Sequence, residues 1–362
     1  MVSRRWRHFD YVLLVVTLLL IALGVVMIYS ATVNTPELED LTRRQLIYAV
    51  IGLGLMGLTA VIDYRLLSSL GLVLYCVILG MLGVVFIAGQ VLMGAQRWID
   101  LGLSIQPSEL AKLLTIIVLA KFLSDHEEDI GRWRYVLMAL AILIPPVVLI
   151  YLQPHLSSAI VLTAVGAVMI FVGGIRWLHV TMIGLAGAAA VPVLWFSLKE
   201  YMQERVLIFI NPQSDPAASY NIEQALTSIG SGGWLGKGFL HGSQSQLGFL
   251  RVRHADFIFS VIAEEFGLVG SLLLLFLLFI MLWRLLRIAE MARDDFGRLI
   301  VVGMTTIIFV QSVINIGMNL HLLPVTGIPL PFVSHGGSSL VTLLLGLGLA
   351  QSVAMRHRKI EF

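Results

Sequence analysis

Charged residues are scarce in this 362-residue chain. Lysine, arginine, aspartate and glutamate together make up 13% of it, whereas hydrophobic residues make up 58%. A soluble domain carries about 25% charged residues. The composition therefore excludes an ordinary soluble protein and indicates one that crosses a membrane several times. The net charge of +2 is too small to indicate a nucleic-acid partner.

Cysteine is almost absent, and no cleaved leader is evident. The single cysteine, Cys76, lies in an apolar run, so no intrachain disulfide can form. The first apolar run, 11–29, is longer than the core of a signal peptide, and no clear cleavage site follows it. We therefore expect this run to be retained as a membrane span.

Long apolar runs dominate what remains, and they predict an all-α polytopic membrane protein with one domain over residues 1–362. Each run is long enough to cross a bilayer as a helix. Ten spans are predicted, at 11–30, 45–62, 66–88, 107–124, 134–151, 156–173, 177–198, 256–284, 299–320 and 336–354.

The distribution of lysine and arginine predicts the orientation. With the N-terminus inside, the short inner connections hold most of these residues, as the positive-inside rule requires. Both termini are then cytoplasmic, and a long loop at 199–255 lies outside, between spans 7 and 8. The unusual sequence also lies outside, at 89–106, 152–155, 199–255 and 321–335. The chain has no GxxxxGK[ST] loop, so a reaction on this face needs a substrate that arrives already activated.

The stretch from Arg251 to Gly270 joins the long loop to the eighth span. As a continuous helix it would place Asp256, Ser260 and Glu264 on one face. A carboxylate at the mouth of a membrane helix is a candidate functional group. The alternative is an interfacial anchor or a salt bridge within the loop.

A second charged pair opens the fourth span. Pro107 suits the first helical turn, and Glu109 and Lys112 are spaced i, i+3, close enough to pair. One interpretation is an intrahelical ion pair that neutralises both charges. The other is a polar cavity in which Lys112 holds an anion and Glu109 sets its position.

Amides and hydroxyls mark the last two spans. Gln311, Asn315 and Asn319 form a polar stripe that must face other helices or water, because lipid would leave the amides unpaired. The stripe fits either hydrogen bonds between helices or a hydrophilic groove. Ser338 and Ser339 follow two glycines at a helix start, which indicates either a phosphate site or close helix packing.

Four motifs together resemble the SEDS family (shape, elongation, division and sporulation), and its elongation branch more than its division branch. The similarity covers nearly the whole chain, including the layout of ten spans. The motifs are GAQRWIDLG at 94–102, QPSELAK at 106–112, HGSQSQLGFLRVRHADFIFSVIAEEFG at 241–267 and PLPFVSHGGSS at 329–339.

The resemblance implies a peptidoglycan glycosyltransferase of the bacterial cytoplasmic membrane. Such an enzyme polymerises lipid II, an undecaprenyl-diphosphate-linked disaccharide-pentapeptide, into glycan strands on the outer face, here for elongation and rod shape. It also implies a class B penicillin-binding protein, a transpeptidase, as partner, besides membrane lipids. A divalent cation, Mg or Mn, is implied too, although the sequence shows no metal site.

The resemblance also assigns roles to residues. Asp256 matches the essential aspartate of the family, and we expect it to act as the general base of an inverting transfer. Glu109 and Lys112 match its charged pair. The cationic side chains near Asp256 are candidates to bind the diphosphate: Lys237, Arg251 and Arg253. Further polar residues are expected to line the cavity and position the substrate: Ser108, Arg97, Asn315, Asn319 and Ser338.

Some positions depart from the family pattern. His155 replaces an acid, His335 a tyrosine and Ala255 a threonine, and Arg251 with Val252 replaces Pro-Glu. Two rival functions stay open. A flippase for the lipid-linked precursor would need a polar route to the inner face. A non-catalytic scaffold for a penicillin-binding protein would tolerate replacement of Asp256.

Overall fold

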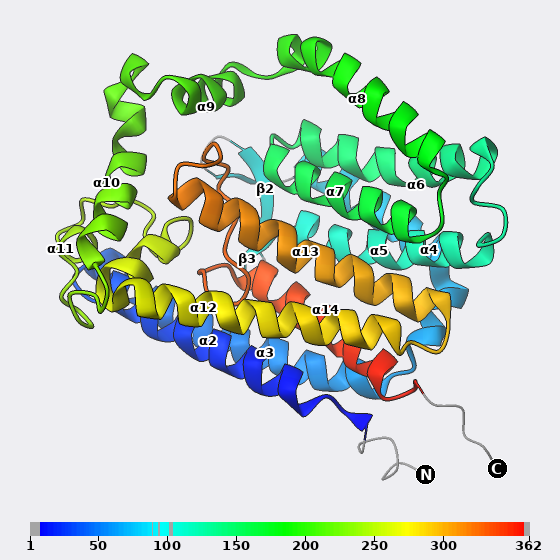
Figure 1. Cartoon of the computed structure of the whole chain (residues 1–362), viewed down its shortest axis with the longest axis horizontal. Coiled ribbons are helices and arrows are strands. Elements are labelled where there is room, and N and C mark those ends of the chain that lie inside the picture. Colours follow the sequence, from blue (N-terminus) through cyan, green and yellow to red (C-terminus); the bar gives the residue numbers. More distant parts are fainter. Residues whose placement is uncertain (1–7, 89, 93–94, 101–103, 358–362) are drawn as a thin grey trace.

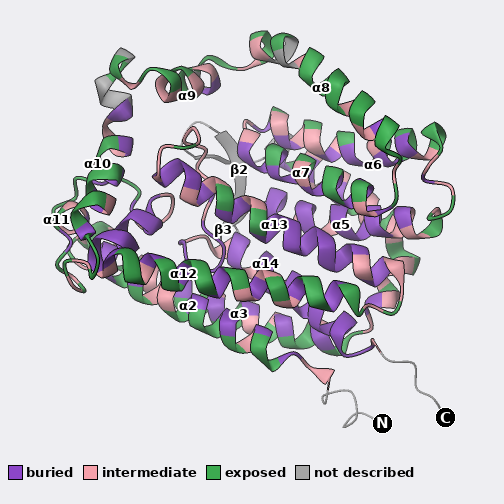
Figure 2. Ribbon diagram, viewed as in Figure 1, coloured by how far each residue is buried: buried purple, intermediate pink, exposed green. Residues whose placement is uncertain are grey.

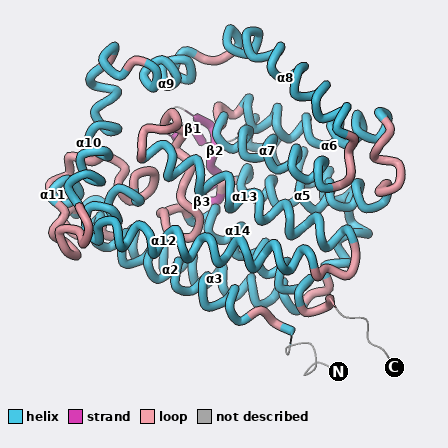
Figure 3. Tube along the Cα trace, viewed as in Figure 1, coloured by secondary structure: helices cyan, strands magenta, loops and turns pink. Residues whose placement is uncertain are grey.

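The computed structural model describes residues 8–88, 90–92, 95–100 and 104–357. Figure 3 shows that helices make up most of this part of the chain. The expectation of a purely α-helical protein misses one small feature. The connection after the third predicted span forms three antiparallel strands in the order β1-β2-β3. They are β1 (Gln90–Leu92), β2 (Ala95–Asp100) and β3 (Ser104–Ile105).

Each predicted span has a helical counterpart, and three shorter helices lie in the predicted long loop (Figure 1). The span helices are α2 (Tyr11–Thr32), α3 (Asp40–Val61), α4 (Gly71–Ala88), α5 (Pro107–Asp125), α6 (Trp133–Leu152), α7 (Leu156–Val172), α8 (Trp177–Ser197), α12 (Ile258–Glu290), α13 (Asp295–Asn319) and α14 (Gly337–Ala354). The loop helices are α9 (Glu200–Ile210), α10 (Pro216–Gly232) and α11 (Ser243–Gln246).

Seven segments of the described chain are long and apolar enough on their own to cross a membrane. These segments contain α2, α3, α4, α6, α12, α13 and α14, and the chain is accordingly a multi-pass membrane protein. The other three predicted spans correspond to α5, α7 and α8. Helix α5 carries Glu109, Lys112, Lys121 and Asp125, so it depends on its neighbours to cover polar groups.

Helix α13 lies at the centre of the bundle. It packs against α5, α7, α12 and α14, while α3 packs along α14 and α2 along α12. Figure 2 shows buried residues facing inward on these helices and exposed ones facing outward. The exposed positions of α12 include large apolar side chains such as Phe276, Phe279 and Trp283, as expected of a surface that faces lipid.

The start of α2 and the end of α14 lie side by side. Asp10 N–H donates to Gln351 Oε1 at 2.9 Å, and Gln351 Nε2 donates back to Asp10 O at 2.8 Å. The Asp10 carboxylate caps α2 by accepting from Leu13 N–H and pairs with Arg284 at 2.6 Å. The start of α2 and the end of α14 therefore lie at the same end of the bundle.

The predicted long loop is largely helical. Figure 1 shows α8, α9 and α10 following one another along the edge of the molecule. Within this loop, α10 packs against α12. A break in α12 allows this docking. Gly267 has φ +63° and ψ −157°, and a Cβ there would lie 2.4 Å from Gly236 N.

Candidate active site

Asp256 lies in a turn that precedes α12. The helix begins at Ile258, so the expectation that Asp256, Ser260 and Glu264 share one helix face is wrong for Asp256. The turn 251–257 is closed by local bonds, including Asp256 N–H to Val252 O at 3.1 Å, and Val252 has φ +51°. The position of Asp256 is thus determined by the turn and not by the helix.

Two asparagines of α13 hold the backbone of Asp256. Asn315 Nδ2 and Asn319 Nδ2 each donate to Asp256 O at 3.0 Å. Asn319 Oδ1 accepts from Ser260 N–H at 3.2 Å and from Ser260 Oγ at 2.6 Å, which fixes the first turn of α12. Asn315 Nδ2 also donates to Ile328 O at 2.8 Å. Both asparagines are fully buried, so the polar stripe serves contacts between segments and does not line an open groove.

The loop 320–336 holds the same turn from a second side. Ser334 Oγ donates to Ala255 O at 2.6 Å, and His335 N–H donates to His254 O at 2.9 Å. Gly327 has φ +72°, and a Cβ at that position would lie 3.5 Å from Asp256 Oδ2. The Asp256 carboxyl group therefore rests against this loop.

Burial raises the pKa of Asp256 to about 6, and the nearby Arg205 guanidinium opposes part of that rise. Arg205 projects from α9 and donates to Val325 O at 3.4 Å and to Thr326 O at 3.3 Å. Sequence reasoning missed Arg205 as a site residue, because nothing in its local sequence distinguishes it from other cations of the long loop. A carboxylate with a pKa near neutrality is suited to accept a proton at neutral pH.

Two histidines flank the aspartate turn. The rings of His254 and His335 have centroids 6.0 Å apart. Burial, with smaller contributions from His254 and Arg44, lowers the pKa of His335 to about 4. Burial and Arg253 also lower the pKa of His254. Both imidazoles are therefore neutral at physiological pH, and His335 adds no charge where the family pattern has a tyrosine.

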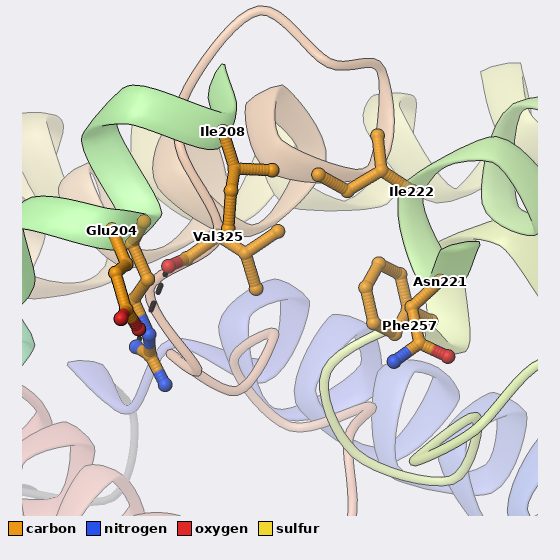
Figure 4. Close-up of a pocket in the computed structure, with 7 residues that line it drawn as sticks. Glu204, Ile208, Asn221, Ile222, Phe257 and Val325 are labelled. Atoms are coloured by element: carbon orange, nitrogen blue, oxygen red, sulfur yellow. Dashed lines mark hydrogen bonds between the residues drawn. The ribbon is translucent and has the colours of Figure 1, made fainter. Parts of the chain in front are cut away.

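A pocket of ≈ 300 Å³ opens beside the aspartate turn, between α9, α10 and the loop 320–336. Its apolar lining comes from Phe257, which follows Asp256, and from three aliphatic side chains: Ile208, Ile222 and Val325. Figure 4 shows Ile208 and Ile222 pointing toward each other across it. Its polar lining is Glu204, Arg205 and Asn221.

Glu109 and Lys112 form the predicted ion pair, with Lys112 Nζ 2.8 Å from Glu109 Oε1. The two residues are only 5% and 2% exposed. A pair this enclosed neutralises its own charge within the bundle, so its geometry favours the intrahelical interpretation. Ser108 is also buried, and its Oγ lies 3.2 Å from His155 Nδ1.

His155 belongs to a polar network that joins α5, α7 and α14. Its Nε2 lies 3.3 Å from Ser158 Oγ, and its Nδ1 lies 3.3 Å from Gln106 Nε2. Gln106 N–H donates to Ser338 Oγ at 2.9 Å, so the Ser338 hydroxyl contacts protein at the start of α14. Ser157 Oγ donates to Thr326 O, which connects this network to the loop against Asp256.

The three cations expected to bind diphosphate have different surroundings. Arg253 is 7% exposed, and its guanidinium donates to Ala31 O at 2.6 Å and to Thr35 Oγ1 at 2.7 Å. It would lose these contacts by turning to a ligand, so the structure gives it a role in holding the turn. The Arg251 side chain is exposed and stays a candidate.

Lys237 is engaged by the loop itself. Its Nζ lies 2.9 Å from Glu264 Oε1 and 2.8 Å from Ser243 Oγ. Glu264 is fully buried and also accepts from Gln244 N–H and Ser245 N–H. The Glu264 carboxylate therefore connects α11 to α12. Because Lys237 is paired with Glu264, it is less suited than Arg251 to bind a diphosphate.

Arg97 lies in β2, and its side chain is outside the described part of the structure. Among the described residues, no group of three or more His, Cys, Asp or Glu side chains is arranged to hold a metal ion. The described site therefore consists of the Asp256 carboxyl group, the exposed cation Arg251 and a pocket whose lining is apolar on one side and carries Glu204, Arg205 and Asn221 on the other.

Comparison with known proteins gives consistent matches over the whole chain. The cell cycle protein family of FtsW, RodA and SpoVE matches residues 10–359. The peptidoglycan glycosyltransferase MrdB of Escherichia coli K12 is 38% identical over 356 residues, covering 98% of this chain and 95% of MrdB. Stage V sporulation protein E of Bacillus subtilis is 38% identical over 360 residues, covering 96% and 98%.

Solved structures agree with the sequence matches. A chain from a peptidoglycan synthase complex, described as coordinating polymerization and crosslinking, aligns with a TM-score of 0.84 at 35% identity. The alignment covers 96% of this chain and 98% of that one. The rod shape determining protein RodA of Thermus thermophilus aligns with a TM-score of 0.74 at 33% identity, covering 97% and 98%.

Proposed function

The chain belongs to the cell cycle protein family of FtsW, RodA and SpoVE, and on this premise we propose how it acts. It is a peptidoglycan glycosyltransferase of cell elongation. Its substrate is lipid II, which it polymerises into glycan strands on the outer face of the cytoplasmic membrane. The observation that carries this proposal is Asp256, a carboxyl group with a raised pKa, held by its backbone beside a pocket.

Asp256 acts as the general base. The acceptor nucleophile is the 4-hydroxyl of N-acetylglucosamine, which is weak at neutral pH. As its oxygen forms a bond to C1 of the donor N-acetylmuramic acid, the hydroxyl proton passes to the Asp256 carboxylate and the bond to the diphosphate breaks. A positioned base typically contributes about 10²–10⁴-fold. The α-linked donor and β-linked product differ by one inversion, so a single carboxylate suffices, unlike in glycoside hydrolysis.

The departing undecaprenyl diphosphate needs positive charge at the place where its own charge develops. Arg251 is exposed next to the aspartate turn. We assign Arg251 to the leaving group in place of Arg253, whose guanidinium is occupied by backbone and hydroxyl oxygens.

A divalent cation is an expectation from the family resemblance. Magnesium ions are usually held by one or two carboxylates together with substrate phosphates. The described site has no cluster of carboxylates for such an ion, and Asp256 is needed as the base, so the substrate phosphates would supply most of its ligands, and the ion would neutralise charge on the diphosphate. The transpeptidase partner is proposed to be a class B penicillin-binding protein. The support is the likeness to a chain from a synthase complex that coordinates polymerization with crosslinking.

Polymerisation and transport are separated by one experiment. The purified protein is incubated with labelled lipid II in detergent, with and without a transpeptidase partner, and glycan products are separated by length. In parallel, vesicles containing the protein are tested for movement of lipid II between leaflets. We expect glycan ladders and no transport. Transport without glycan would instead identify a flippase, and glycan only from the partner would identify a scaffold.

A further inference from the structure

The pocket beside Phe257 has the chemistry of a site for an N-acetylated sugar. We propose that it binds the N-acetylglucosamine ring of the acceptor, with the acetamido group directed toward Asn221 and the ring hydroxyls toward Glu204 and Arg205. This inference rests on the proposed function and adds to it the place where the acceptor sugar is recognised.

Size and position favour one sugar ring next to the base. The volume of ≈ 300 Å³ is at the small end of the range for ligand sites, about 300–1,000 Å³. It suits a single ring better than a whole disaccharide-pentapeptide. Phe257, which lines the pocket, follows Asp256 in the chain. Arg205, which also lines the pocket, is close enough to Asp256 for its charge to lower the pKa of that carboxyl group. A ring in this pocket would therefore lie beside the turn that carries the Asp256 carboxylate.

The lining matches the two sides of an acetamido sugar. Such a sugar presents C–H groups and a methyl on one side and hydroxyls and an amide on the other. The pocket provides the apolar side chains of Ile208, Ile222 and Val325 for the first. For the second it provides a carboxylate, a guanidinium and an amide, which accept and donate hydrogen bonds in fixed directions.

Asn221 is oriented for one particular bond. Its Oδ1 accepts from Arg251 N–H at 3.4 Å, which directs the oxygen toward the aspartate turn. Figure 4 shows its amide nitrogen turned toward the other residues of the pocket. Nδ2 can donate there, and the carbonyl oxygen of an acetamido group is an acceptor that matches it. A free amine on the sugar would offer no such acceptor.

The first arm of the test compares pocket variants in the lipid II polymerisation assay. Asn221→Asp keeps an oxygen for Arg251 N–H and removes the donor into the pocket. We expect KM to rise about three- to tenfold, as for the loss of one neutral hydrogen bond, with kcat unchanged. Ile208→Trp fills the pocket and should raise KM further. Leu207→Trp, at an exposed neighbouring position of α9 outside the lining, is the matched control and should behave as wild type.

The second arm changes the substrate. Two lipid II analogues are compared, one with a free amine on the glucosamine ring and one with a free amine on the muramic acid ring. Wild type should discriminate against the first analogue, and Asn221→Asp should lose that discrimination. Discrimination against the muramic acid analogue alone would overturn the assignment to the acceptor ring.

Two negative results have different meanings. If wild type makes no glycan, the proposed function fails and this assignment fails with it. If wild type makes glycan but both pocket variants keep its KM, and neither analogue is disfavoured, only the sugar assignment fails. Thermal unfolding of each variant at a midpoint close to that of wild type ensures that the comparison is between folded proteins.

Discussion

Asn319→Ala tests whether the backbone clamp positions Asp256. The Asn319 side chain is fully buried and makes four hydrogen bonds, one of them from Nδ2 to Asn315 O at 2.8 Å. It donates to Asp256 O at 3.0 Å, and it accepts from Ser260 N–H at 3.2 Å and Ser260 Oγ at 2.6 Å. Truncation leaves the Ser260 groups without this acceptor, so we expect a loss of about 1–3 kcal/mol in the free energy of unfolding.

The expected effect on rate is larger than the effect on folding. Asn315 Nδ2 still donates to Asp256 O in the variant, so the turn stays attached but less strictly placed. A misplacement of about 1 Å in a reacting group typically lowers the rate about 10²-fold. Polymerisation is measured far below the unfolding midpoint, where the protein is fully folded. We predict that kcat falls by about two orders of magnitude while the KM for lipid II changes little.

Gln311 provides the matched control on the same stripe of α13. It is buried, and its Oε1 has no hydrogen-bond partner among the described residues, so Gln311→Leu removes an unsatisfied atom. We expect unchanged kcat and equal or greater stability. The positioning role is refuted if Asn319→Ala lowers the unfolding midpoint but keeps kcat within twofold of wild type. Equal losses of kcat from both variants would also refute it.

Three further predictions follow from the electrostatics of the site. Because Asp256 must be ionised to accept a proton, kcat should rise with pH through about 6, and Arg205→Gln should move the midpoint upward since Arg205 lowers the pKa of Asp256; a pH–rate profile checks both. The folded-state pKa of Asp256 lies above its ordinary value of 3.8, so folded wild type loses stability as pH rises through about 6. Asp256→Asn has no carboxyl group to ionise at this position. Denaturant titrations should therefore show its unfolding free energy increasing relative to that of wild type between pH 4 and pH 7, by at most about 3 kcal/mol. Lys112→Ala should lower the free energy of unfolding by about 3–5 kcal/mol, because Glu109 is left as a buried unpaired charge. The double variant Glu109→Gln/Lys112→Met should lower it less, and thermal unfolding of the single and double variants compares them.

The helices were predictable because their signal is local. Apolar runs of sufficient length form helices in a membrane whatever their neighbours are, and all ten predicted spans have helical counterparts. The Glu109–Lys112 pair was predictable for the same reason, since residues three apart on a helix are neighbours. The three strands at 90–105 were missed because their pairing depends on contacts that this short stretch of sequence does not reveal.

The geometry of the site was less predictable because distant segments determine it. The start of α12 is set by Asn315 and Asn319, about sixty residues away in sequence, and this places Asp256 outside the helix. Arg251 and Arg253 are equivalent by composition. The exposure of one and the burial of the other follow from the turn conformation and from the contacts of Arg253 with α2 and Thr35.

The central claim is that the carboxylate of Asp256 takes the proton in glycan synthesis. The most direct test measures the rate of glycan formation from labelled lipid II at pH 7.5 by purified wild type and by purified Asp256→Asn, with unfolding midpoints determined on the same samples. The account predicts that the variant folds at least as stably as wild type and loses about 10²–10⁴-fold in rate. A stable variant that polymerises lipid II at the wild-type rate would contradict it.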